Sequence, residues 1–240
     1  MKEFIINRND SGQRLDKFVL KAVPRLPQSM MYKAIRNKRI KINGKRAEIS
    51  SRLCEGDTVQ MYLNDEFFDS VTETEFMSVS SVLNIIYEDE NIMLLDKKNG
   101  MVVHEDDDNT ADTLINRVKR YLYDKGEYDP NAENSFAPAL CNRLDRNTGG
   151  IVIAAKNAES LRILNQKIRD REIEKYYLCI TAGVPSKRAD TVTAYLEKDS
   201  ASNTVKVTDR KSSTNKTIVT SYRVIRDNGS LALVEIKLGT

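Results

Sequence analysis

Residues 142–157 read NRLDRNTGGIVIAAKN, a polar loop that runs directly into an apolar stretch. One acidic residue of the loop, Asp145, stands between Arg143 and Arg146. Two positive charges this close favour the ionised form of a carboxylate, and the glycine pair that follows lets the backbone turn sharply or approach a ligand closely. Residues 151–155 are apolar and predict a strand that anchors the loop. The pattern indicates that the chemistry of this chain is centred on Asp145.

The same stretch resembles the signature HRLDxxTSGxxxxAKN of the RluA-type RNA pseudouridine synthases. Asn142 stands where that family has histidine and Gly149 where it has serine, whereas the charged R-L-D core and the A-K-N tail are unchanged. Two further segments match the family. Residues 96–105, DKKNGMVVHE, resemble its KPxGxxVH strand, and residues 174–183, EKYYLCITAG, resemble its KxYxAxVxG strand. The resemblance therefore covers nearly the whole chain.

The resemblance implies roles for individual residues. Asp145 would be the catalytic residue, Tyr177 would stack on the target uracil and move its proton, and Arg143 would hold the RNA with the base extruded. Lys175 and Arg146 would also bind the substrate. These roles suit the chemistry, because a base within a helix must be flipped out before its glycosidic bond can be reached, and an aromatic face beside an arginine suits an unstacked base. Without the resemblance, Tyr177 would be interpreted as a core aromatic residue and Asp145 as a turn residue paired with arginine.

The reaction so implied is the isomerisation of uridine in RNA to pseudouridine, and the resemblance implies no cofactor and no metal. The bond from ribose to the ring nitrogen breaks, the uracil rotates, and the ribose rejoins at ring carbon 5. A carboxylate can attack the anomeric carbon or the pyrimidine ring, or abstract a ribose proton, and the sequence leaves these three routes open. Each of them needs Asp145 in its ionised form.

Length and composition restrict the classes of protein to which the chain can belong. The chain has 240 residues and a mass of 27.3 kDa, which suggests one or two domains. Its first residues, MKEFIINRND, lack the apolar stretch expected of a secretory signal, and no apolar run approaches the roughly 20 residues that a membrane span needs. Three cysteines without metal-binding spacing fit a reducing compartment, so we expect a cytoplasmic protein. The single histidine, His104, argues against a His-rich metal site, and we interpret it as a strand-end residue with a structural hydrogen bond.

The net charge of +3 conceals an asymmetry along the chain. Residues 1–63 have 14 basic and 6 acidic side chains, residues 64–110 have 2 and 13, and residues 111–240 have 22 and 16. A net charge of +8 on the short first block is typical of a protein that binds phosphate backbones. The acidic middle is interpreted as a linker and solvated turns.

The basic block predicts a small module of two helices and a hairpin. Apolar residues recur at helical spacing between Leu15 and Ala22, prolines follow, and Ser29 can cap a second helix. Residues 40–46, IKINGKR, place Asn-Gly between strand residues, which predicts a hairpin. The pattern is similar to the RNA-binding module named after a small-subunit ribosomal protein, over residues 12–63. The cations expected to contact RNA are Arg14, Lys33, Arg36, Lys38, Arg39 and Lys41.

For the whole chain we expect an α+β fold of three parts. These are the RNA-binding module at residues 1–63, an acidic linker at 64–82, and a catalytic domain at 83–240 built on a mixed, largely antiparallel sheet. Within the last part, residues 100–105, GMVVHE, read as a short strand. In the family, a GRxHQIR segment follows the strand that LALVEIKLGT resembles. Because the chain stops at Thr240, we expect a C-terminally truncated catalytic domain with reduced activity.

Three functions from different classes remain. The first is an RNA pseudouridine synthase that acts on structured rRNA or tRNA and has no DNA or membrane partner. The second is a non-catalytic RNA-binding protein on a decayed or truncated synthase scaffold. The third is a carboxylate-dependent hydrolase, which would need a second acid or a metal cluster near Asp145. Its one candidate is the acidic run at residues 106–108, which we interpret as a solvated turn.

Overall fold

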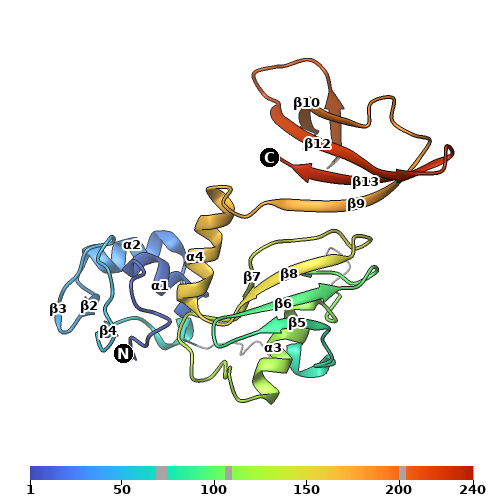
Figure 1. The fold of residues 1–240 in the computed structure, drawn as a ribbon. Coiled ribbons are helices and arrows are strands. Elements are labelled where there is room, and N and C mark those ends of the chain that lie inside the picture. The colour runs from blue at the N-terminus through green and yellow to red at the C-terminus, as the bar shows by residue number, and fades with distance from the viewer. Residues whose placement is uncertain (69–74, 106–109, 200–203, 240) are drawn as a thin grey trace. The chain divides into compact units, whose positions relative to one another are not determined.

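The computed structural model describes residues 1–68, 75–105, 110–199 and 204–239, and it divides into two compact units. The first unit is Met1–Gln166 and the second is Lys167–Thr240, so the division falls within a helix, α4 (Ala158–Arg169). Figure 1 shows the helices and strands of both units along the chain. No helix in the described ranges is long and apolar enough to cross a membrane.

The first part of unit 1 is a small sheet covered by two helices (Figure 1). Its elements are β1 (Lys2–Ile5), α1 (Leu15–Ala22), α2 (Gln28–Arg36), β2 (Ile40–Ile42), β3 (Lys45–Arg46) and β4 (Thr58–Met61). The strands are antiparallel in the order β1-β4-β2-β3. Buried apolar side chains from both helices and three of the strands form one core, in which the Phe4 and Phe18 rings meet edge to face at 5.8 Å.

The predicted hairpin is confirmed, and the reason is the turn. Asn43 and Gly44 have φ values of 51° and 73°, the left-handed conformation that a two-residue hairpin turn of this twist requires. The start of the second helix differs from the prediction. Pro27, not Ser29, occupies the N-cap position, and its side chain has no oxygen to accept a hydrogen bond. Ser29 lies one residue inside α2.

In the acidic stretch after the module, one aromatic side chain is buried. The stretch contains two short 3-10 helices, η1 (Asp65–Phe67) and η2 (Glu75–Ser78). Phe76 in η2 is buried, and its ring lies 6.0 Å from the rings of both Tyr123 and Tyr128. Burying an aromatic ring stabilises a fold by a few kcal/mol, about 3–5 on truncation to alanine. The stretch interpreted as a solvated linker is therefore fixed to the following domain at this residue.

The rest of unit 1 is a second antiparallel sheet with α3 (Leu114–Asp124). Its strands are β5 (Ile85–Glu88), β6 (Ile92–Lys97), β7 (Ala139–Leu140) and β8 (Gly150–Ala155), in the order β5-β6-β8-β7. The short strand predicted at 100–105 is wrong, because its carbonyl groups have another use. Val102 and Val103 accept hydrogen bonds from the first backbone amides of α3, at 2.8 and 3.2 Å. Those amides have no partner inside the helix.

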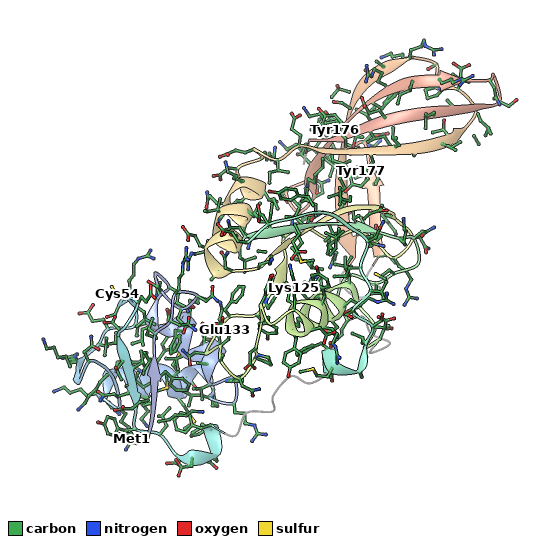
Figure 2. All side chains as sticks on the ribbon, turned by 60° about the horizontal axis from the view of Figure 1, so that its bottom comes forward. Met1, Cys54, Lys125, Glu133, Tyr176 and Tyr177 are labelled. Atoms are coloured by element: carbon green, nitrogen blue, oxygen red, sulfur yellow. The ribbon has the colours of Figure 1, made fainter. Side chains whose placement is uncertain are left out.

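Polar side chains join the N-terminal module to the loop before β7. The Asp10 carboxylate is fully buried and accepts hydrogen bonds from Asn134 at 2.7 Å and Ser135 at 2.5 Å. Asn7 and Asn9 donate to Glu133, which Figure 2 labels, at 3.1 and 2.6 Å. These contacts place the loop that leads into β7 directly against the module.

Unit 2 is a five-stranded antiparallel sheet. Its strands are β9 (Lys175–Ala182), β10 (Ala189–Asp199), β11 (Thr204–Thr208), β12 (Lys216–Asp227) and β13 (Leu231–Leu238), in the order β11-β10-β12-β13-β9. A small core of Val224, Ala232 and Val234 lies on one face. The predicted α+β class is confirmed. The largely antiparallel sheet predicted for residues 83–240 is present as two sheets, β5-β6-β8-β7 in unit 1 and β11-β10-β12-β13-β9 in unit 2.

Candidate active site

The loop that holds Asp145 is tied to β8 at its start. The Asn142 side chain donates to the carbonyl of Ile151 at 3.1 Å and accepts from the amide of Ile153 at 2.9 Å. It thus continues the ladder between β7 and β8 beyond the last paired residue of β7. Asn142 stands where the family signature has histidine, and here it acts as a backbone mimic. At the other end of the loop Gly150 has a φ of 140°, which side-chain-bearing residues rarely adopt.

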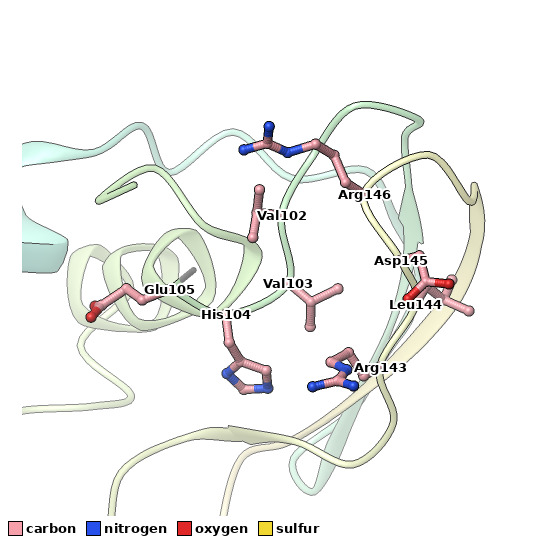
Figure 3. Close-up of a pocket in the computed structure, with 8 residues that line it drawn as sticks. All are labelled: Val102, Val103, His104, Glu105, Arg143, Leu144, Asp145 and Arg146. Carbon is pink, nitrogen blue, oxygen red and sulfur yellow. The ribbon is translucent and has the colours of Figure 1, made fainter. Parts of the chain in front are cut away.

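A pocket of about 320 Å³ opens at this loop (Figure 3). Its lining residues are Val102, Val103, His104, Glu105, Arg143, Leu144, Asp145 and Arg146. Figure 3 shows the His104 ring and the Arg143 guanidinium on the same side of the pocket. Asp145 and Arg143 are exposed, whereas Leu144 between them is buried and anchors the loop. The structure therefore brings together Arg143, Asp145 and Arg146, as the sequence predicts.

Asp145 lies between Arg143 and Arg146 in the sequence, and the structure lets us ask whether it forms an ion pair with either of them. In the described part of the chain, no ion pair joins the Asp145 carboxylate to Arg143 or Arg146. The backbone of the loop forms a turn at Asp145, in which the Asp145 carbonyl accepts a hydrogen bond from the Thr148 amide at 3.0 Å. Asp145 is therefore an exposed residue of the pocket lining.

The interpretation of His104 as a strand-end residue with a structural hydrogen bond is wrong. Residues 101–105 form no strand, and the imidazole makes no hydrogen bond to any residue that the structure describes. Partial burial lowers the pKa of His104, and the nearby charges of Arg143 and Lys119 lower it further. The neutral ring is therefore favoured beside the pocket.

One charged residue of the site was missed by the sequence reasoning. Lys97, the last residue of β6, is only 1% exposed. Its side chain falls on the same inward face as Met93 and Leu95, since burial alternates along the strand. That alternation was the available signal, because it places a lysine at a position where an apolar residue is expected.

The two predicted residues of β9 lie in unit 2. Lys175 is exposed and pairs with Leu238 across the sheet, and Tyr177 is half-buried opposite Ile236. Figure 2 shows Tyr177 on this strand beside Tyr176. Tyr177 is not part of the apolar core of the unit, and its hydroxyl makes no hydrogen bond to a described residue. Tyr177 is therefore not packed in the apolar core of unit 2, as an ordinary core aromatic residue would be.

The cations predicted to contact RNA separate into two groups. Arg14 holds both oxygens of Asp16 at 3.0 Å. The other five are Lys33, Arg36, Lys38, Arg39 and Lys41, which run from the end of α2 through the turn into β2. Two further exposed cations, Lys45 and Arg46 in β3, extend this group, because Arg46 pairs with Lys41 across the hairpin.

An aromatic side chain lies within the second group. Tyr62 is 42% exposed, its amide donates to the Arg39 carbonyl at 2.8 Å, and the Lys41 ammonium lies 5.3 Å from its ring centroid. An exposed ring among cations suits both phosphate and base contacts.

Among the residues that the structure describes, no three His, Cys, Asp or Glu side chains gather in a metal-binding arrangement. The acidic run at 106–108, on which the hydrolase alternative depends, lies outside the described residues.

The structure thus joins a small basic module to a second region, in which an aspartate and two arginines line one pocket. Residues 91–240 match the family model of RNA pseudouridylate synthase, and residues 13–59 match that of the S4 domain. The chain belongs to the RNA pseudouridylate synthase family and carries an N-terminal S4 domain.

Known relatives agree with this family. The chain is 40% identical over 185 residues to an uncharacterized RNA pseudouridine synthase of Mycoplasma capricolum, covering 76% of this chain and 59% of that protein. It is 30% identical to ribosomal large subunit pseudouridine synthase C of Rickettsia bellii, and the match covers 93% of this chain and 73% of that protein. The chain thus spans about three fifths of the length of the Mycoplasma relative.

A solved structure shares the fold. Human RNA pseudouridylate synthase domain containing 4 superposes with a TM-score of 0.52 at 24% identity, over 65% of this chain and 59% of that one.

Proposed function

We propose that the protein converts specific uridines of structured RNA, ribosomal RNA in particular, to pseudouridine with Asp145 as the catalytic residue. The observation that carries the proposal is the position of Asp145, whose carboxylate is exposed in a pocket within the part of the chain that matches the synthase family. The choice of ribosomal RNA is supported by the name of the Rickettsia relative. Three free cysteines and an RNA substrate suit the cytoplasm.

The reaction requires an ionised carboxylate and a uridine whose base is flipped out of the helix. The bond from ribose C1′ to N1 breaks, the uracil turns, and C1′ bonds to C5. C5 then loses its proton, and N1 takes one up, so the nucleoside keeps its composition. Asp145 would supply the nucleophile or base, and Arg143 at the same pocket would hold the backbone of the extruded nucleotide.

The other substrate contacts belong to the same proposal. Tyr177 would stack on the uracil and move its proton, and Lys175 and Arg146 would contact phosphate. Half-burial of Tyr177 outside the apolar core supports a free aromatic face.

Residues 1–63 would act as the RNA-binding module, followed by the linker at 64–82 and the catalytic domain at 83–240. The cations from Lys33 to Lys41, with the Tyr62 ring, would dock a structured RNA. The module meets the loop before β7 through Asp10 and Glu133, so RNA bound there is held by the unit that contains Asp145.

Tritium release tests the proposal directly. Ribosomal RNA transcribed with uridine labelled at C5 should lose tritium to water when incubated with the protein, because formation of the new bond at C5 displaces that hydrogen. Digestion and chromatography of the RNA should then give pseudouridine in equal amount. RNA that is bound with no release of tritium would contradict the proposal and support a non-catalytic RNA-binding protein.

A further inference from the structure

A loop of the N-terminal module, residues 7–13, contacts the segment that leads into β7. Asp10 in this loop is fully buried, and its carboxylate accepts hydrogen bonds from the Asn134 side chain at 2.7 Å and the Ser135 hydroxyl at 2.5 Å. Asn134 also donates to the carbonyl of Ile5, at 2.8 Å. Among the described residues, neutral donors hold the Asp10 carboxylate and no cation forms an ion pair with it.

The same loop contacts the start of α4. The Asn9 side chain accepts a hydrogen bond from the Ala158 amide at 3.1 Å, which satisfies one of the first backbone donors of the helix. Its amide group donates to Glu133, before β7, at 2.6 Å. Asn9 thus bridges a residue before β7 and a residue after β8. The loop that holds Asp145 lies between these two strands, so the module binds both ends of the segment that carries Asp145.

Residues 7–13 are also fixed to their own module. The Gly12 amide donates to the Leu53 carbonyl at 2.8 Å, the Leu53 amide donates to the Gln13 carbonyl at 3.0 Å, and Leu53 is part of the apolar core of the module. The cations expected to contact RNA lie elsewhere, from the end of α2 to β2. The module therefore has two separate faces, one for RNA and one for the rest of unit 1.

The hydrogen bonds of Asn9 and Asp10 with Glu133, Asn134, Ser135 and Ala158 are called the docking contact below. A contact of this kind holds one orientation, because each hydrogen bond weakens steeply when its angle departs from linearity. A satisfied buried polar network adds to the constraint, since other arrangements leave some of its groups unpaired. The RNA-binding face and the Asp145 pocket, which both belong to unit 1, are thus held in one relative orientation.

We propose that the docking contact selects the uridine that is modified. Asn9, Asp10 and Asn134 are positioning residues: they touch no substrate, and they hold RNA bound to the module in one orientation to Asp145. The substrate that fits this arrangement is an RNA in which a folded element and the target uridine keep a fixed separation. The inference rests on the proposed function and adds a determinant of its specificity.

A change at Asn134 tests the docking contact without touching the core of the module. Asn134→Asp replaces the donor that faces Asp10 by a second carboxylate, so two negative charges repel each other at the centre of the contact. Asn131→Asp is the matched control, because it makes the same change in the same segment, on an exposed side chain that donates to Asp129. The double variant Asp10→Asn with Asn134→Asp exchanges donor and acceptor, which restores a hydrogen bond across the contact.

Nitrogen-15 relaxation of the full chain measures docking in the absence of RNA. Amides of residues 13–59 should tumble with those of β5 to β8 in the unchanged protein and in Asn131→Asp, and faster than those in Asn134→Asp. Affinity for ribosomal RNA should be the same in all variants, because the cations of the module are retained.

Single-turnover reactions on that RNA, mapped uridine by uridine, measure selection. Asn134→Asp should form pseudouridine at the preferred uridine roughly 10- to 100-fold more slowly, as for a small displacement of a bound substrate. The double variant should regain most of this rate, which a general loss of stability does not allow. If Asn134→Asp does not fold, Asn9→Ala takes its place, since it removes the bonds to Glu133 and Ala158.

Four results would overturn the proposal. They are independent tumbling of the module in the unchanged protein, an unchanged rate at the preferred uridine in Asn134→Asp, an equal loss in Asn131→Asp, and no recovery in the double variant. Failure of the proposed function would look different, because the unchanged protein would then form no pseudouridine in any RNA while its relaxation data still reported a docked module.

Discussion

Glu88→Gln should destabilise the protein at neutral pH and make little difference in acid. Glu88 ends β5, and its side chain is 15% exposed. One oxygen accepts from Lys125 at 2.7 Å and Lys156 at 2.9 Å, and the other accepts from the Tyr121 hydroxyl at 2.9 Å. Figure 2 labels Lys125 in this cluster. Burial alone raises the pKa of Glu88, but these hydrogen bonds outweigh it and lower the pKa from 4.5 to about 2.

The size of the effect follows from that shift. A difference of this size between the unfolded and folded pKa corresponds to about 3 kcal/mol of folding free energy at pH 7. Because the folded pKa is the lower one, this stabilisation is complete above the unfolded value of 4.5 and is lost as pH falls toward about 2. Glutamine cannot ionise, so the variant lacks the part of this contribution that depends on the charge of Glu88.

Urea unfolding of the two proteins, repeated between pH 7 and pH 3, measures this directly. The difference in unfolding free energy should be largest at pH 7 and should shrink steadily below pH 4.5. The variant keeps part of the electrostatic stabilisation, because Glu127 still pairs with Lys125 and Lys156. The reasoning is refuted if the difference is the same at pH 7 and pH 3, or if the variant is as stable as the unchanged protein at pH 7.

Two further changes test the RNA-binding surface and the anchor of the acidic stretch. Changing Arg36 and Lys38 together to Glu should weaken RNA binding. The slope of log affinity against log salt concentration should fall by about 2, since each lost phosphate contact removes about one. The same change at Arg8 and Lys21 is the control, and an unaltered slope in the Arg36 and Lys38 variant would contradict the assignment. Phe76→Ala should lower the unfolding free energy by about 3–5 kcal/mol, because the buried ring leaves a cavity against Tyr123 and Tyr128; a loss below 1 kcal/mol in urea unfolding would show that the ring is dispensable.

Local signals in the sequence were sufficient for most of the elements. The Asn-Gly turn specified the hairpin, because both residues tolerate the left-handed backbone that it needs. The signature loop and the apolar run after it placed Asp145 before β8 and in a common pocket with Arg143 and Arg146. These features depend on neighbours in sequence, so periodicity and motif spacing can reveal them.

The features that were missed depend on contacts between distant segments. The carbonyls of Val102 and Val103 cap α3 instead of joining a sheet, which the apolar run alone does not show. Phe76 is buried by Tyr123 and Tyr128, which lie about 50 residues along the chain. Lys97 could be found by its inward position on β6, but the hydrogen bond from its Nζ to the Arg146 carbonyl becomes visible only once the loop has folded over it.

The central claim is that the Asp145 carboxylate performs the chemistry, and one substitution tests it most directly. Asp145→Asn keeps the size and polarity of the side chain and removes its charge, while the carbonyl that closes the turn with Thr148 belongs to the backbone and is unaffected. Under single-turnover conditions on C5-labelled ribosomal RNA, the variant should bind RNA and unfold like the unchanged protein and release no tritium. Substantial pseudouridine formation by the variant would show that another group carries out the reaction.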